Sequence, residues 1–311
     1  MKNRVVFFNC SFFVLAVVGL QAKVATVQKT ENFSFHLPAL KNKKNFVKKN
    51  TKPSFLTMRT SQKSERNTLK KELNLLTRHK NISDLSFKEL RKAANLSLQI
   101  GWKEKALSYI RKMIVLATDS AMIEKLKLEI ADVLFERGKL AAAEEAFSEY
   151  LNLYPGSPHS EYAHYKKILC ALYRTHDIDQ DQGQTQSTKK LCHAYLKKGI
   201  AFKKYRKEVN DIMHHCDIML YQHEVNVFEF YLHKKSFTAA TNRLAYLKEK
   251  HLPLLRVVEP DIIKLECKLA EAQGNTKRYN ERLAYLNKKF PQHGTTVRVA
   301  QRTKKNYGSR F

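Results

Sequence analysis

The chain has 311 residues, of which 43% are hydrophobic, so it is long enough for one or two ordinary domains or for one extended array of repeats. Nine Gly and seven Pro are few for this length, and no convincing run of alternating apolar and polar residues indicates a strand. The composition therefore argues against a sheet-rich fold and predicts an all-α protein. The formal net charge of +28 is uneven: residues 23–84 hold fifteen Lys and Arg against four Asp and Glu, and residues 292–311 hold five against none.

Residues 1–22 have the pattern of a secretory signal peptide. Lys2 and Arg4 form a short basic region, residues 5–20 are mostly apolar, and small residues follow for cleavage. An uncleaved membrane anchor is the alternative, because the apolar stretch is near the lower length limit of a transmembrane helix. Cys10 follows two Phe and an Asn, with a long apolar run still to come, so it is a poor lipidation site. The expected location is the periplasmic face of the outer membrane, with peripheral attachment.

Two basic segments flank the centre of the chain, a linker over 23–65 and a tail over 292–311. Low hydrophobicity and like charge leave them too little apolar surface to offset chain entropy, so disorder is expected. Such segments attract an anionic membrane or cell-wall surface, while a solubilising role without a partner is the alternative. No specific nucleic acid is expected, because the aromatic residues lie mainly in the helical region, away from the densest Lys runs.

Residues 66–291 are predicted to form a tetratricopeptide-like solenoid of about five helix pairs. A short amphipathic helix over 67–84, with Leu69, Leu73 and Leu76 on one side, precedes them. A helix-turn-helix repeat of about 34 residues needs small residues where paired helices touch and a turn residue between the helices. The best match, residues 124–157, supplies these with Ala131, Gly138, Ala143, Phe147 and Pro155.

Weaker matches begin at residues 87, 221 and 260, with turn positions at Gly101, Lys235 and Gly274. A further unit over 158–199 is interrupted by the polar segment "THDIDQDQGQTQ". Between units, Pro155 and Gly156 end one helix, and Ser157 and Ser160 are candidate N-caps of the next.

No pattern in the sequence predicts catalysis, a cofactor or a metal site, so a non-enzymatic protein is expected. Nucleotide loops, zinc-protease helices and nucleophile elbows are missing. His214, His215 and Cys216 are adjacent, and consecutive residues of a helix point about 100° apart, so they cannot converge on one ion. The single cysteines in helical stretches are interpreted as core residues rather than disulfide or metal ligands: Cys170, Cys192, Cys216 and Cys267.

Three segments in this order, "FSEYLNLYPGSPHSEYAHY", the acidic "DIDQDQGQT" and "HEVNVFEFYLHKKSFTAATNRLAYL", closely resemble the BamD family of outer-membrane assembly lipoproteins. The resemblance spans residues 86–291. It implies a periplasmic adaptor that binds the barrel-assembly outer-membrane protein, its accessory subunits and unfolded outer-membrane protein substrates. Two departures stand out: the acylated Cys of the family is missing at the end of the signal, and its second Tyr-Pro turn is replaced by "KKGIAFKKY".

In this family-like array, the first helices of the pairs are expected to line a groove for an extended, amphipathic barrel strand. Phe135, Tyr162 and Tyr165 are predicted to make apolar contacts, with Arg91 and Lys125 for the strand's carboxylate. Packing between repeats is the alternative role of the two tyrosines.

Glu224, Tyr231 and Arg243 match the family pattern on later helices and are further candidates for partner binding. A structural ion pair between Glu224 and Arg243 is favoured over direct partner contact. Two other functions remain open for the whole chain. One is an exported polyanion-binding repeat protein acting on cell-wall polymer or DNA. The other is a repeat protein of the cell-envelope constriction system, against which the acidic insertion argues.

Overall fold

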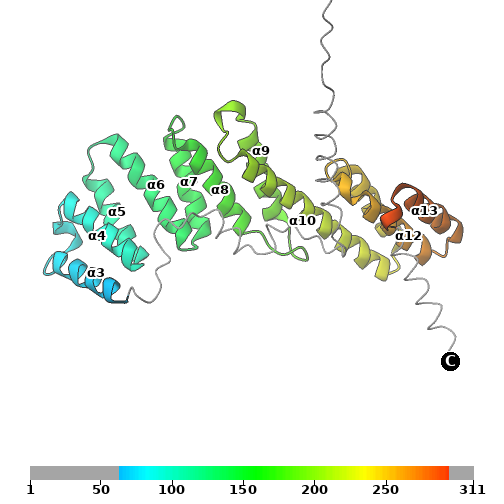
Figure 1. The fold of residues 1–311 in the computed structure, drawn as a ribbon, viewed down its shortest axis with the longest axis horizontal. Helices are drawn as coiled ribbons and strands as arrows, with labels where there is room; N and C mark the ends of the chain where they lie inside the picture. The colour runs from blue at the N-terminus through cyan, green and yellow to red at the C-terminus, as the bar shows by residue number, and fades with distance from the viewer. Residues whose placement is uncertain (1–62, 294–311) are drawn as a thin grey trace, which may run out of the picture. The chain divides into compact units, whose positions relative to one another are not determined.

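The computed structural model describes residues 63–293, and all the regular structure in this range is helical (Figure 1). The expected signal peptide, most of the basic linker and nearly all of the basic tail lie outside the described residues. Within the described range, the search for a helix of sufficient length and apolarity to cross a bilayer finds no candidate.

Five antiparallel helix pairs follow one another along the chain, which confirms the predicted fold class. In each pair the two helices pack on each other, and α7 also packs on the α8 of the next pair. The pairs are α4 (Phe87–Ile100) with α5 (Lys103–Leu116), α6 (Ser120–Glu136) with α7 (Leu140–Leu153), α8 (Ser160–Tyr173) with α9 (Gly183–Leu196), α10 (Arg206–His233) with α11 (Phe237–Tyr246), and α12 (Glu259–Ala272) with α13 (Thr276–Lys289).

The small and apolar residues of the repeat template lie where paired helices meet. Ala131, Ala143 and Phe147 are fully buried, and so are Ala94 and Ala106 of the preceding pair. An alanine at such a contact lets two helix backbones approach closely, which a larger side chain would prevent. The template thus identified core positions from the sequence.

An additional helix, α3 (Lys63–Leu76), packs on α4 and buries Leu73. The predicted helix over 67–84 therefore exists but ends earlier than expected. The helix ends at Leu76, the turn that follows contains His79 with a positive φ of 61°, and residues Ile82–Asp84 form a single 3-10 turn. Ser86 then starts α4 through a capping box with Glu89.

The Tyr-Pro-Gly-Ser boundary is held by a carboxylate rather than by serine caps. Glu124 of α6 accepts hydrogen bonds from the Tyr150 hydroxyl at 2.7 Å and from the Ser157 hydroxyl at 2.5 Å. The N-cap of α8 is His159; Ser157 accepts the His159 backbone N–H at 3.0 Å and so lies before the cap. Ser160 is the first residue of α8 and donates to the Tyr154 carbonyl, so the expectation that either serine is the N-cap was wrong.

The next boundary repeats this arrangement without its sequence motif. Glu161 of α8 accepts hydrogen bonds from the Tyr195 hydroxyl at 2.7 Å and from the Lys204 backbone N–H at 2.6 Å. Phe202 packs on Tyr195 with ring centroids 5.1 Å apart, as Tyr154 packs on Tyr150 at 5.3 Å. The segment "KKGIAFKKY" therefore forms the same kind of joint as the Tyr-Pro turn that it replaces.

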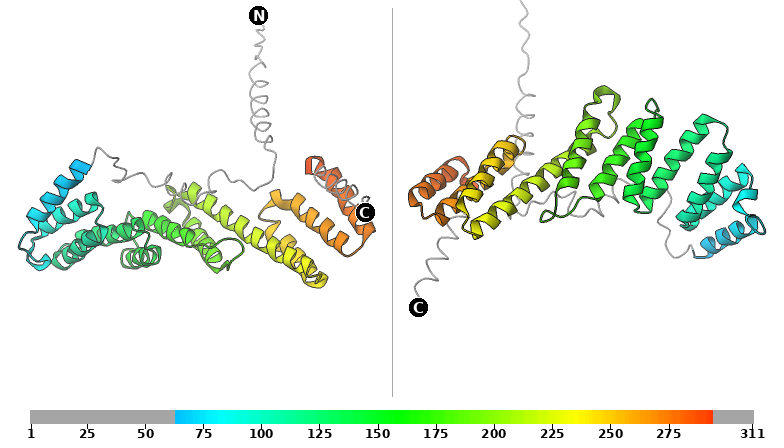
Figure 2. Two further views of the ribbon diagram at one scale, coloured as in Figure 1. Left: turned by 90° about the horizontal axis from the view of Figure 1, so that it is seen from below. Right: turned by 180° about the vertical axis from the view of Figure 1, so that it is seen from behind.

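Helix α10 joins the two halves of the array as one continuous element. Its first part packs on α9 and its last part on α11 (Figure 2). The sequence predicted a repeat that begins at residue 221 and no element over 206–220. The helix instead begins at Arg206.

Candidate functional site

The first helices of the second and third pairs are linked by side chains on one face, which is the face where the peptide groove was predicted. The Tyr162 hydroxyl donates to Asp132 Oδ1 at 2.7 Å, joining α8 to α6. Lys166 lies one helical turn after Tyr162, with its Nζ 3.9 Å from Asp132 Oδ1 and 4.2 Å from the centre of the Phe135 ring. On α4, Arg91 forms an ion pair with Glu129 of α6, with 2.7 Å between Nη1 and Oε2.

Two of the predicted groove aromatics lie inside the protein. Phe135 is 6% exposed and packs on Tyr173, while Tyr165 is 4% exposed and stacks on Tyr205 with ring centroids 4.2 Å apart. For Tyr165, burial favours the alternative of packing between repeats. Tyr162 is half-buried, whereas the Lys125 side chain is exposed.

Burial raises the pKa of Asp132 above its usual range, and the hydrogen bond from Tyr162 and the charge of Lys166 oppose this shift only in part. Burial also raises the pKa of Tyr162, and the Asp132 carboxylate adds to that effect. The face therefore combines a neutral phenol, a partly dehydrated carboxylate and a lysine. Such a set can hydrogen-bond a peptide backbone and can attract an anionic end group.

Two of the three candidates on the later helices contact each other. Arg243 of α11 forms an ion pair with Glu224 of α10, with 3.2 Å between Nη1 and Oε2, as the favoured interpretation expected. Tyr231 lies against Phe230, whose side chain is 56% exposed. Phe230, exposed beside the half-buried Tyr231 at the end of α10, is suited to contact with another protein.

The acidic insertion is an ordered loop between α8 and α9. The Gln182 side chain donates to the backbone carbonyls of Asp177 and Gln180. The Ile178 carbonyl lies 2.8 Å from Nδ1 of His223, next to Glu224 on α10. The insertion and the "HEVNVFEFY" segment, which together gave the most specific resemblance, are thus in contact.

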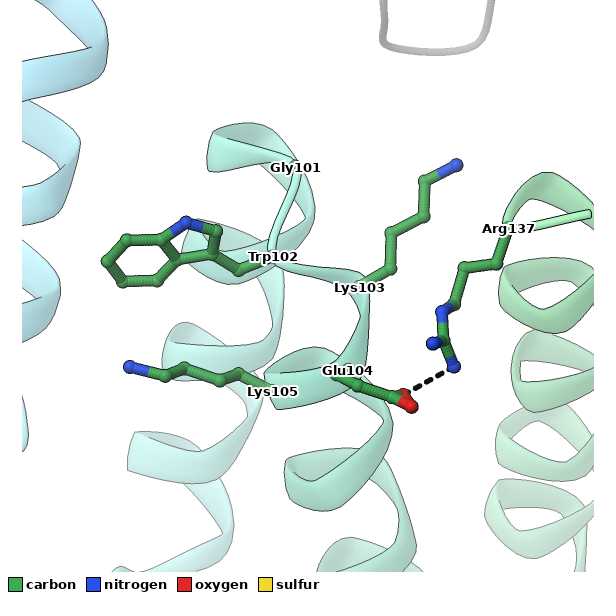
Figure 3. A pocket seen from close by; sticks show the side chains of 6 residues that line it. All are labelled: Gly101, Trp102, Lys103, Glu104, Lys105 and Arg137. Atoms are coloured by element: carbon green, nitrogen blue, oxygen red, sulfur yellow. Dashed lines mark ion pairs between the residues drawn. The ribbon is translucent and has the colours of Figure 1, made fainter.

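An open pocket of about 530 Å³ lies at the α4–α5 turn and is lined by Gly101, Trp102, Lys103, Glu104, Lys105 and Arg137 (Figure 3). Trp102 has Lys105 Nζ 4.4 Å from its ring centre, and Arg137 forms an ion pair with Glu104. The ammonium of Lys103 donates to the Glu136 carbonyl, so two of the lining cations are already bound to neighbouring helices. The sequence patterns did not predict this pocket.

Within residues 63–293 no group of three or more His, Cys, Asp or Glu is placed to hold a metal ion. The four cysteines of this range are free and buried, which confirms their interpretation as core residues. Lys166, which contacts Asp132 and Phe135 on this face, was not among the predicted residues, although its position four residues after Tyr162 on one helix face was a usable signal.

Stacked helix pairs, linked through side chains on a shared face, define a tetratricopeptide-like repeat protein. The profile of the YfiO family, described as outer membrane lipoprotein, matches residues 83–259, more than half of the chain. The chain therefore belongs to the YfiO family, which is the BamD family of the sequence resemblance.

Curated sequences and solved structures were also compared with this chain. Among curated proteins no sequence matches this chain. PilW, a type IV pilus biogenesis factor, is similar in structure at 15% identity and a TM-score of 0.29, covering 76% of this chain and 92% of its own. A tetratricopeptide repeat protein from Parabacteroides merdae ATCC 43184 has 12% identity and a TM-score of 0.31, covering 78% and 81%. Both scores are too low to support an inference.

Proposed function

We propose that this protein is a non-catalytic adaptor of outer-membrane β-barrel assembly, which binds the barrel-assembly protein, its accessory subunits and incoming barrel substrates at the periplasmic face of the outer membrane. The observation that supports this most is the family match over residues 83–259, which spans the consecutive helix pairs from α4 to α11. A repeat array with several exposed faces suits a scaffold that binds more than one partner.

Affinity purification tests the adaptor role directly. The full-length protein, tagged at its C-terminus, is purified from detergent-solubilised membranes, and the co-purifying proteins are identified by mass spectrometry. A barrel-assembly outer-membrane protein should be enriched over an untagged control. If only soluble cell-wall or DNA-associated proteins are recovered, the adaptor role is wrong.

For substrates, we propose that an extended barrel strand binds the face formed by α4, α6 and α8. The exposed Lys125 and the half-buried Tyr162 are the accessible contacts, whereas Phe135 and Tyr165 support the face from beneath. Arg91 can bind the strand's carboxylate only by exchanging its partner Glu129. Lys166, largely buried beside Tyr162, is a third cation of this face.

Titration of a peptide from the C-terminus of a barrel protein tests this face. Lys125→Gln and Tyr162→Phe should each weaken binding by roughly three- to ten-fold, as for the loss of one polar contact. Lys277→Gln, an exposed lysine on α13, is the control and should bind like wild type. Equal affinity of all four proteins would exclude the face.

For partners, we propose that Glu224, Tyr231 and Arg243 position or form a docking surface at α10 and α11. Arg243→Ala would break the pair with Glu224, while Phe230→Ser would remove exposed apolar area next to Tyr231. If the barrel-assembly protein no longer co-purifies with the Phe230→Ser variant, and the melting temperature of the variant is unchanged, direct contact between this surface and the partner is supported. Retention in both variants would show that these residues only stabilise the helix pair.

Cys10, which lies outside the described residues, is proposed not to be an acylation site, because no small residue precedes it. Labelling with a radioactive fatty acid, in wild type and in Cys10→Ser, tests this. Label that disappears in the variant would refute the proposal.

A further inference from the structure

The connector between α9 and α10 is the most basic exposed segment of the described array. Six Lys and Arg occur between residues 197 and 207 without an Asp or Glu among them, and all six are exposed: Lys197, Lys198, Lys203, Lys204, Arg206 and Lys207. The ion pairs found in the described part of the chain involve none of these six. Their charge is therefore not neutralised by neighbouring carboxylates.

Ile200 is at the centre of this connector, in the 3-10 turn Gly199–Ala201, and its side chain is 83% exposed. Cations on both sides of a protruding isoleucine combine the two features by which peripheral proteins bind bilayers. The apolar side chain enters the acyl boundary, and the cations remain among the anionic headgroups.

The connector is fixed on the third helix pair rather than free to collapse. Phe202 is buried against His164 and Tyr195, with ring centroids 5.2 and 5.1 Å away. Tyr205 stacks on Tyr165, and the Lys204 backbone donates to Glu161. The same contacts that form the repeat boundary therefore keep Ile200 and the lysines on the outside.

Other exposed apolar residues lie along the same edge of the array. The connectors α5–α6, α7–α8 and α9–α10 each join a second helix to the first helix of the next pair, and Figure 1 shows all three on one edge. Val115 and Leu116 end α5 and are 74% and 42% exposed, and Leu153 ends α7 at 51%.

We infer that this edge, centred on the α9–α10 connector, docks on an anionic phospholipid surface. A bilayer fits better than an acidic protein, because the exposed apolar side chains of this edge lie at three separate connectors and a fluid leaflet can accept each without a shaped pocket. Charge complementarity provides the attraction, and membership of a family of outer membrane lipoproteins places a membrane nearby. The inference goes beyond the adaptor role and does not depend on which proteins the array binds.

A charge-matched pair of full-length variants tests the inference. The loop variant replaces Lys197, Lys198, Lys203 and Lys204 with Gln. The control variant replaces four exposed lysines elsewhere with Gln: Lys71, Lys190, Lys277 and Lys288. Both variants have the same net charge, so the basic segments outside the described residues contribute equally to both.

Binding is measured by co-sedimentation with vesicles of phosphatidylcholine containing phosphatidylglycerol, at low and physiological salt. Each cation near an anionic surface contributes roughly five-fold, so the loop variant should bind at least about ten-fold more weakly than the control variant. Ile200→Ser should weaken binding by roughly five-fold, with its effect persisting at the higher salt. Circular dichroism should show unchanged helix content and melting in all variants.

Equal vesicle binding by the loop and control variants would overturn the inference. Soluble polyglutamate distinguishes a membrane site from a general anion site. If the loop variant loses polyglutamate and vesicle binding to the same extent, and Ile200→Ser changes neither, the lipid assignment is wrong.

Discussion

Single carboxylates at the repeat boundaries show how residue chemistry sets the spacing of whole helices. Glu124 joins the start of α6 to the end of α7 and to the following turn through Tyr150 and Ser157. These hydrogen bonds, that from Ser157 first, lower the pKa of Glu124, so the ionised acceptor is favoured in the folded protein. Burial raises the pKa of Tyr150 to about 12, so it remains a donor throughout the physiological range.

Tyr150→Phe should lower the free energy of unfolding by about 1 kcal/mol, because it removes one buried hydrogen bond while keeping the ring. Tyr154→Phe is the matched control, since Tyr154 packs on Tyr150 but is only half-buried. Its effect should stay within about 0.5 kcal/mol. Urea unfolding followed by circular dichroism measures both. Equal effects would mean that the Tyr150 hydroxyl does not hold the boundary.

The free energy of unfolding of Asp132→Asn, relative to wild type, should rise with pH. Removal of a stabilising, ionised carboxylate would make it fall with pH. Because burial raises the pKa of Asp132 in the folded state, its contribution to stability is complete below the unfolded value of 3.8 and is lost as pH rises through the folded pKa. The Asn variant keeps an acceptor for Tyr162 but carries no charge. It should therefore gain stability relative to wild type as pH rises from 3.8 to 7. A variant that loses stability over this range would show that the Lys166 interaction outweighs burial.

At the scale of helices, the turn inside four of the five pairs contains one residue in the left-handed region, whereas α8 and α9 are joined by the longer acidic loop. Gly101, Gly138 and Gly274 have φ values of 86°, 74° and 70°, and Lys235 has 57° at the same position of its pair. A side chain in this region costs roughly 1–2 kcal/mol, which glycine avoids. The α10–α11 turn is therefore the strained member of the set.

Lys235→Gly should raise the free energy of unfolding by about 0.5–1 kcal/mol, the strain released less the extra entropy of an unfolded glycine. Lys234→Gly is the neighbouring control. Lys234 has a helical φ of −73°, so glycine relieves no strain there and should destabilise by about 1 kcal/mol. Thermal and urea unfolding of both variants provide the comparison. If Lys235→Gly destabilises as much as its control, the turn is not strained.

The sequence predicted the helix pairs well because their signals are local. Small residues such as Ala131 and Ala143, and a turn residue such as Gly138, recur at similar spacing in the units with short turns. The second boundary was not recognised, because Phe202 and Lys204 reproduce the Tyr-Pro turn through a ring and a backbone N–H, without a shared motif.

The predicted groove residues show a different limit of sequence reasoning. Helical spacing placed Phe135 and Tyr165 on the face of the first helices, but only the packing of α6 and α8 on their neighbours determines that both rings are covered. The same spacing placed Arg91 and Lys125 on this face. It did not show that Arg91 is paired with Glu129, or that Lys125 is exposed. Burial and pairing are tertiary properties, so periodicity could narrow the site only to a helix face.

At the scale of the molecule, α10 determines whether the helix pairs behave as one cooperative unit. In a repeat array each unit is stabilised mainly by its neighbours, so cooperativity depends on every interface. The interface between the third and fourth pairs is a single helix, which buries Val209 and Ile212 in its first part and Phe228 in its last. Helix continuity therefore couples the two halves.

His214→Pro should uncouple them. His214 is exposed on α10 in the part that packs on α9, three residues before Asp217, which pairs with Lys189 of α9, so the proline interrupts the helix before the part that packs on α11, at a cost of about 3 kcal/mol or more. Trp102, the single tryptophan, reports the N-terminal pairs by fluorescence, while circular dichroism reports all helices. The two urea transitions should coincide in wild type and in His214→Ala, and should separate in His214→Pro. Coincident transitions in the proline variant would show that coupling passes through side-chain contacts between the pairs and not through the continuous backbone of α10.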